Sequence, residues 1–285
     1  MRKKAVVLTF PGHFLLTKLT IASLQKIKSI QEIVVIVDDI SPMSWDTYVN
    51  DCAEFYELPI IQTSNFIEFL KFADNPWVRQ QMIKMHLDLI FNDQEIFFTD
   101  GDIEFHHDVP YNSVPYTLTS YSGVSLEERD PGPGEVTSQQ IYYVRHFLNK
   151  PFDGLFHNGK RITTSAAPFR DLDLDILKQL REYIQKVQNK SFIQAHQDIS
   201  LDYRYSISEW EILEYFKQEI LKTDLNFVYY PPYSIDELPN NTHKGPDWFA
   251  TCFVSDTQLD YEWWLQKNIA NIENYWKQLP NKKYD

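Results

Sequence analysis

The sequence predicts an α/β fold, Rossmann-like, in which a mixed but mostly parallel sheet is flanked by helices. Aliphatic runs predict strands at residues 5–10, 33–37, 59–62 and 95–99. Apolar residues at helical spacing predict helices between them at 14–29, 42–56 and 77–92. The β-α-β-α-β order of the first sixty residues is typical of a Rossmann-like half. Strands this apolar along both faces fit a buried parallel sheet.

The rest of the chain has a less regular pattern. Helices are expected over 137–149, 171–188, 208–221 and 261–279, a strand over 226–230, and a polar Pro/Gly loop over 127–135. The sequence contains no internal repeat and no low-complexity linker. We therefore expect one domain spanning residues 1–285.

Composition narrows the classes of function. The 40 acidic and 27 basic residues give a formal net charge of -13, which argues against nucleic-acid binding because that needs a basic face. Cys52 and Cys252 do not have the spacing of metal ligands. We expect them to be free thiols in a reducing compartment. The apolar run 5–10 is too short for a signal peptide or membrane span. We expect a cytoplasmic protein without a membrane span.

Acidic residues follow two of the predicted strands. Asp100-Gly101-Asp102 comes directly after strand 95–99, and Asp38-Asp39 follows strand 33–37. Two carboxylates separated by one glycine suit a hard cation, Mn²⁺ or Mg²⁺, that keeps positions open for phosphates. Because ligands of open α/β sheets bind beyond the carboxyl ends of strands, all four acids are expected at one crevice. The alternative is an ordinary Asp-Gly turn.

These motifs resemble a known family. The helix with the pattern W-x-R-Q-Q-x-x-K at residues 77–84, followed by Phe-Phe-Thr-Asp-Gly-Asp at 97–102, is similar to GT-A glycosyltransferases. It looks most like a poorly characterised group of bacterial and viral proteins, which also carries an S-E-aromatic motif, here Ser208-Glu209-Trp210. The resemblance is patchy and spans roughly residues 5–250.

The resemblance implies a glycosyltransferase that uses a metal and a nucleoside-diphosphate sugar. Residues 1–110 would bind the donor, with a UDP-sugar favoured, and residues 111–285 would bind a glycan or other hydroxyl acceptor. Asp100 and Asp102 would hold the metal, and the metal would hold the diphosphate.

The same resemblance assigns contacts to other polar residues. Arg79 and Lys84 would contact phosphate or sugar, with Gln80 as a polar contact, although both cations also fit the solvent-facing side of their helix. Asp38 or Asp39 would accept hydrogen bonds from the ribose or a uracil-type edge. Equally, one of them would cap the helix expected at 42–56.

A second segment is similar to retaining glycosyltransferase family 8, which carries a late H-x-x-G-P-x-K-P-W sequence. His243, Gly245, Pro246 and Trp248 fit it, but the spacing is shorter and the Lys-Pro pair is missing. The similarity implies His243 as a third metal ligand and Lys244 as a diphosphate contact. The alternative is an exposed loop, with His106 and His107 as rival ligands.

An inverting transferase needs a carboxylate base near the acceptor hydroxyl, whereas a retaining one relies on positioning and the leaving phosphate. Glu209 is the first catalytic candidate, although it equally fits a helix N-terminal acid. Asp198 is the second, followed by Asp202. Residues 163–168 supply small polar groups for an acceptor site. Trp210 and Trp248 fit sugar stacking, or the core.

Two other functions compete. A haloacid-dehalogenase-type phosphatase also ends a strand in Asp-x-Asp, with the first Asp as nucleophile. Against it, the Asp38-Asp39 pair precedes Asp100-Gly101-Asp102 instead of following it, and Ile103-Glu104 replaces the expected Gly-Thr. A GT-A-like module that binds nucleotide or glycan without catalysis is the other alternative.

Overall fold

The computed structural model describes residues 3–10, 14–39, 58–63, 76–105, 112–118, 136–164, 169–200, 209–229 and 250–252. The chain forms two compact units that interleave along the sequence. The first comprises Met1–Gln62, Phe97–Tyr111 and Pro231–Asp285, and the second comprises Thr63–Ile96 and Asn112–Tyr230. The single domain with functional halves 1–110 and 111–285 stays a prediction.

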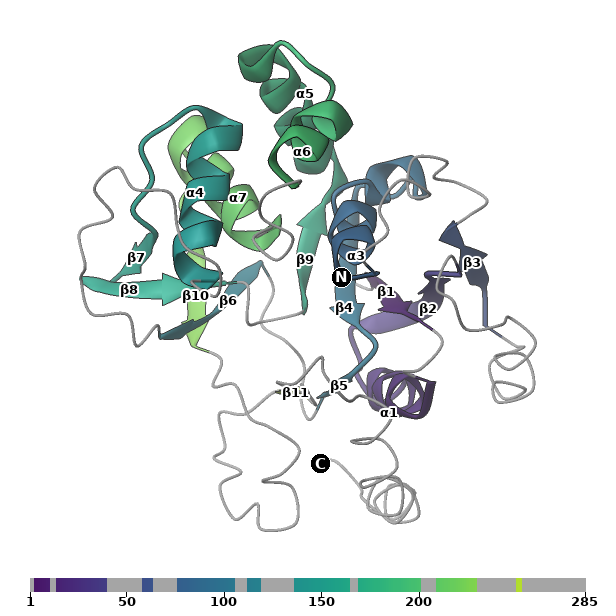
Figure 1. Cartoon of the computed structure of the whole chain (residues 1–285). Coiled ribbons are helices and arrows are strands. Elements are labelled where there is room, and N and C mark those ends of the chain that lie inside the picture. Colours follow the sequence, from purple (N-terminus) through teal and green to yellow (C-terminus); the bar gives the residue numbers. More distant parts are fainter. Residues whose placement is uncertain are drawn as a thin grey trace. The chain divides into compact units, whose positions relative to one another are not determined.

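The first unit is built on parallel strands in the order β3-β2-β1-β4 (Figure 1). Their bounds are β1 (Lys3–Thr9), β2 (Ile30–Val37), β3 (Ile60–Gln62) and β4 (Glu95–Asp100). The last five residues of β1 and of β2 are all buried. Because both faces of these strands are covered, each reads as an unbroken aliphatic run. The prediction of a mostly parallel sheet with these four strands is confirmed.

Helix α1 fixes the chain that follows β4. Three further elements belong to this unit: α1 (Phe14–Leu24), β5 (Ile103–Phe105) and β11 (Ala250–Cys252). The hydroxyl oxygen of Thr20 accepts from the amide of Ile103 at 3.0 Å, and that of Ser23 accepts from the amide of Phe105 at 3.0 Å. β11 pairs with β5 in antiparallel orientation. Two buried hydroxyl groups of α1 thus fix the position of β5 against this helix.

The second unit combines helices with a separate sheet in the order β10-β6-β8-β7 (Figure 1). Its strands are β6 (Ser113–Leu118), β7 (Leu155–His157), β8 (Lys160–Thr163) and β10 (Asn226–Tyr229). A further strand of this unit, β9 (Phe169–Asp173), is not part of that sheet. Its helices are α3 (Pro76–Lys84), α4 (Val136–Leu148), α5 (Leu174–Gln188), α6 (Phe192–Ser200) and α7 (Glu209–Tyr215). A 3₁₀ turn, Leu87–Leu89, follows α3, and a π-helical segment, Phe216–Ile220, continues α7.

Helix α5 shows how local sequence sets an element. The carboxylate of Asp173 accepts from the amide of Asp175 at the N-terminus, and Asn189 ends the helix in the left-handed conformation. Its buried residues recur at helical spacing: Leu174, Leu177, Leu180 and Ile184. The predicted helix 171–188 therefore forms, but its first three residues belong to β9.

The predicted helix 77–92 is too long. Helix α3 ends at Lys84, and the chain then tightens, with His86 N bonded to Ile83 O at 3.0 Å. Arg181 of α5 forms a two-pronged ion pair with Asp88, both contacts at 2.6 Å, and donates to the carbonyl of Met85. This guanidinium satisfies the end of the helix and stabilises the tighter turn.

Leu89, an apolar residue within the predicted helix 77–92, lies in the 3₁₀ turn and is 58% exposed. The predicted helices 42–56 and 261–279 and the loop 127–135 lie outside the described residues. None of the helices in the described part of the chain has the length and apolar character needed to cross a membrane.

Candidate functional site

Polar residues collect where three adjacent parallel strands of the first unit end. The register pairs Leu8 of β1 with Asp100 of β4, and Thr9 of β1 with Val37 of β2. One residue after β2, the amide of Asp38 donates to the carbonyl of Thr9 at 2.9 Å. Asp38 and Asp100 therefore lie at the same edge of the sheet, the carboxyl edge at which open α/β sheets bind ligands.

The Asp100-Gly101-Asp102 turn is packed closely against the sheet and α1. Asp100 is the last residue of β4, and both carboxylates are half-buried with Oδ1 of each screened from solvent. A Cβ atom built on Gly101 would lie 2.6 Å from Oγ1 of Thr17 and 3.1 Å from the carbonyl oxygen of Leu8. Glycine is needed here because the backbone packs closely against Thr17 and β1.

Replacing Gly101 with alanine is expected to destabilise the first unit by about 1–3 kcal/mol, the usual range for overpacking. The new methyl would collide with the Thr17 hydroxyl, which is held by the Thr9 hydroxyl at 2.6 Å. Urea denaturation of Gly101→Ala measures the effect. Combining it with Thr17→Ala should recover part of the loss, relative to Thr17→Ala alone. Wild-type stability of Gly101→Ala would contradict the packing argument.

The acidic residues present fit a divalent cation of the Mg²⁺ or Mn²⁺ type. In the described residues no three His, Cys, Asp or Glu side chains converge in a metal-binding arrangement. Two neighbouring carboxylates nevertheless suffice for Mg²⁺, which proteins usually hold through one or two carboxylates together with substrate phosphates. The predicted third ligand His243, the diphosphate contact Lys244 and the rival ligands His106 and His107 lie outside the described residues.

The two acids after β2 differ in access to solvent. Asp38 is 0% exposed, whereas Asp39 is half-buried. Of the pair predicted to meet a nucleoside, only Asp39 presents surface to a ligand. The helix that one of them was expected to cap lies outside the described residues.

Helix α3 places its cations inside the second unit. Arg79 and Lys84 are each only 3% exposed, so the alternative that put them on the solvent-facing side of the helix is wrong. Lys84 Nζ lies 3.1 Å from Oε1 of Glu209, the first residue of α7, in an ion pair that is almost fully buried. Gln80 is half-buried. The ion pair joins the two segments that carry the family resemblance.

Trp210 occupies the core beside these charges. Its side chain is 0% exposed. The Arg170 guanidinium lies 4.0 Å from the ring centroid, and Lys84 Nζ lies 5.4 Å from it. Both distances fit cation–π interactions. Of the two roles predicted for Trp210, the structure supports the core role. Trp248 lies outside the described residues.

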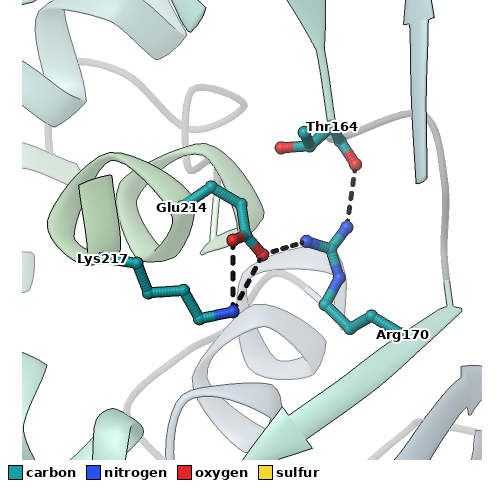
Figure 2. A network of polar contacts seen from close by, with 4 residues as sticks. All are labelled: Thr164, Arg170, Glu214 and Lys217. Atoms are coloured by element: carbon teal, nitrogen blue, oxygen red, sulfur yellow. Dashed lines mark hydrogen bonds and ion pairs between the residues drawn. The ribbon is translucent and has the colours of Figure 1, made fainter. Parts of the chain in front are cut away.

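A buried network that the sequence analysis missed surrounds Glu214 of α7 (Figure 2). Arg170 of β9 donates to Oε1 of Glu214 at 2.9 Å and to the carbonyl of Thr164 at 3.0 Å. Lys217 donates to Oε2 of Glu214 at 3.1 Å. Arg170 and Glu214 are each 1% exposed in their side chains. The signal was present in the sequence: a buried helix with three glutamates needs matching cations.

Two of the small polar residues predicted for an acceptor site form hydrogen bonds with side chains of the second unit. The Thr163 hydroxyl donates to Oε1 of Glu211 at 2.6 Å, and Glu211 is 4% exposed. Thr164 is fully buried, and its carbonyl accepts from Arg170. Residues 165–168 lie outside the described residues. The two described threonines therefore contribute to the interior of the second unit.

Asp198 lies on α6 in an exposed ion pair. Its carboxylate accepts from Lys190 at 2.6 Å and from Gln194 at 3.0 Å. These two hydrogen bonds, with Lys190 the larger effect, lower the pKa of Asp198 below its ordinary value. A general base works best with a pKa near the operating pH, so this environment does not suit the predicted catalytic role. Asp202 lies outside the described residues.

Two buried neutral groups lie near the Lys84–Glu209 pair. The Tyr143 hydroxyl and Nδ1 of His196 are 3.3 Å apart. Burial, followed by the charge of Glu209, raises the pKa of Tyr143 well above its ordinary value. Burial lowers the pKa of His196 to about 4. Both groups are therefore neutral at pH 7, and the charges of this interior are carried by the lysine, arginine and glutamate side chains.

No protein-family model and no curated protein matches the sequence. Among solved structures, the chain is similar to a crystal structure of the galactosyltransferase LgtC in complex with donor and acceptor sugar analogues. The TM-score is 0.44 and the sequence identity 10%, and the similarity covers 95% of this chain and 95% of that one.

Proposed function

We propose that the chain is a metal-dependent glycosyltransferase that moves a sugar from a nucleoside-diphosphate sugar to a hydroxyl acceptor such as a glycan. The observation that carries the proposal is the edge formed by β2, β1 and β4. Asp39, Asp100 and Asp102 all follow or end strands there, at the side where α/β sheets bind nucleotides. A UDP-sugar is the favoured donor, on the family resemblance.

The residues of the first unit have distinct proposed roles. Asp100 and Asp102 would hold Mn²⁺ or Mg²⁺, with His243 as third ligand and Lys244 beside the diphosphate. A bound cation would neutralise the diphosphate and make it a better leaving group. Asp39, half-buried at the end of β2, would accept hydrogen bonds from the nucleoside.

The fully buried members of the predicted set have supporting roles in this proposal. Asp38 is enclosed behind the edge, and Arg79 lies within the interior of the second unit. Gln80 keeps its proposed polar contact, because it is half-buried while Arg79 and Gln81 beside it are enclosed. For Lys84 to contact a phosphate, it would have to leave Glu209.

Both carboxylates predicted as a base are already paired with a lysine. Glu209 accepts from the buried ammonium of Lys84, and Asp198 accepts from Lys190. A substrate hydroxyl would have to displace the lysine in either case. A reaction that relies on positioning and on the leaving diphosphate, as a retaining transferase can use, would need neither of these carboxylates as a base.

A thermal-shift panel of UDP-, GDP-, CMP- and dTDP-sugars, with and without Mn²⁺, tests the proposal. One nucleotide class should raise the melting temperature, and only when metal is present. A ligand at 100 times its Kd stabilises the folded protein by about 2.7 kcal/mol. The stabilising donor should also release free sugar slowly.

The competing functions give different results in the same experiments. Metal-dependent stabilisation without any release of sugar or transfer would identify a binding module. Hydrolysis of a simple aryl phosphate, without any response to nucleotide sugars, would identify a phosphatase. Either result would contradict the proposed transferase activity.

A further inference from the structure

Four aromatic side chains of the second unit form a cluster that is open to solvent. Tyr116 of β6 contacts His157 of β7, Phe227 of β10 and Tyr229 of β10, at centroid distances of 5.3, 6.0 and 5.7 Å. His157 and Phe227 are 5.2 Å apart. Tyr229 is 49% exposed, and the other three rings are half-buried. We call these four residues the aromatic cluster.

Strand register explains why the rings meet. Tyr229 is the direct partner of Tyr116 in the parallel β10–β6 pair, so both side chains lie on the same side of the sheet. Phe227, two residues earlier on β10, shares that side because side chains alternate along a strand. The sheet therefore presents adjacent rings together with two phenol hydroxyls and an imidazole.

The strands that carry the aromatic cluster differ in their charged residues from the chain as a whole. The protein has a formal net charge of -13, yet the strands of this sheet, β6, β7, β8 and β10, contain no Asp or Glu. Lys160 is exposed and is the register partner of His157, which places it on the same side of the sheet. A lysine next to exposed rings in an acidic protein complements an anionic ligand.

We propose that the aromatic cluster and Lys160 bind an anionic carbohydrate, meaning a glycan whose sugars carry a carboxylate or phosphate. Aromatic faces pack against the C–H face of a sugar ring, while the two phenols and the imidazole hydrogen-bond to hydroxyl groups. Lys160 forms an ion pair with the acid group. The site needs no metal and no nucleotide, so it stands independently of the proposed transferase.

Single-stranded nucleic acid also stacks on aromatic side chains next to cations. The net charge of -13 opposes that reading, because affinity for a polyphosphate comes mostly from neutralising its charge. A carbohydrate with isolated acid groups needs only one well-placed cation. The observations therefore favour the glycan.

The test is titration calorimetry of the full chain, in EDTA and without nucleotide sugar, against a defined panel. The panel contains oligosaccharides of glucuronic, galacturonic and sialic acid and a phosphorylated mannose oligosaccharide, each beside a neutral oligosaccharide of similar length. At least one anionic member should bind more tightly than its neutral counterpart. Tyr229→Ala should weaken that binding about tenfold, as expected for loss of a stacking ring.

Matched substitutions separate the site from general effects. Lys160→Gln should reduce binding of the anionic sugar to the level of the neutral one, whereas Lys178→Gln, another exposed lysine, should leave it unchanged. Phe156→Ala removes an exposed ring outside the aromatic cluster and serves as the control for Tyr229→Ala. The proposal is overturned if no panel member binds, if Tyr229→Ala and Lys160→Gln bind like their controls, or if a single-stranded oligonucleotide binds more tightly than every sugar.

Discussion

Glu214→Ala is expected to destabilise the second unit by about 3–5 kcal/mol, because removing one partner of a buried ion pair leaves an uncompensated charge. Arg170 would keep its positive charge at 1% exposure, with Lys217 close to the same space. The hydrogen bond from that guanidinium to the Thr164 carbonyl does not neutralise its charge.

Chemical denaturation, monitored by far-UV circular dichroism, measures the loss. Glu219→Gln is the matched control, because it breaks an exposed pair with Lys222 at 3.3 Å on the same helical segment. Exposed pairs contribute about 0–1 kcal/mol, so this variant should unfold close to the wild type. A similar, small effect of Glu214→Ala and Glu219→Gln would contradict the assignment of Glu214 as the centre of the network.

A double variant distinguishes lost charge pairing from lost packing. Arg170→Met combined with Glu214→Leu removes both charges and keeps apolar volume, which is often neutral or stabilising for a buried pair. It should therefore be more stable than Glu214→Ala. If it is less stable, the Arg170 contacts with Thr164 and with the Trp210 ring contribute more than the pairing does.

The strands of the first unit were predictable because burial on both faces leaves a simple signal. Ile33–Val37 is aliphatic at every position, and the structure buries each of these residues in β2. Asp100 was placed correctly at the end of β4 for the same reason, since the apolar run stops there. Where a strand is covered on both sides, the amino-acid pattern alone defines its length and its polar end.

The cations of α3 were not predictable from helical periodicity. Lys84 and Arg79 occupy polar positions in the pattern, and a polar residue on a helix is normally exposed. The burial of Lys84 depends on an acid more than a hundred residues away, because Glu209 is bonded to it across 125 positions. The residue pattern of one segment does not identify a partner that lies far away in the sequence.

The end of α3 and the aromatic cluster were not predicted from the sequence, for a related reason. The helix stops where Arg181, almost a hundred residues later, binds the turn. The rings of Tyr116 and Tyr229 become neighbours only through pairing of β6 with β10. Both features are produced by tertiary contacts, so their sequence signals are weak until the strand order is known.

Asp100→Asn and Asp102→Asn are each expected to abolish the Mn²⁺-dependent stabilisation by the donor and to lower sugar transfer by roughly 10²-fold or more, the range seen when one electrostatic contact to a transition state is removed. Asparagine keeps the size of the side chain and removes one negative charge. The cation would lose a ligand, and the diphosphate would lose the charge that holds it at the edge of the sheet.

The comparison with and without metal separates a binding role from a structural one. In EDTA each variant should melt close to the wild type, because removing one of two neighbouring carboxylates also removes their mutual repulsion. In Mn²⁺ plus donor, the wild type should gain stability by mass action while the variants should not. Asp175→Asn, an exposed acid of α5, should respond as the wild type does. If the Asp100 and Asp102 variants unfold at lower temperature in EDTA yet keep the full donor shift, the two carboxylates support the fold, and the cation lies elsewhere.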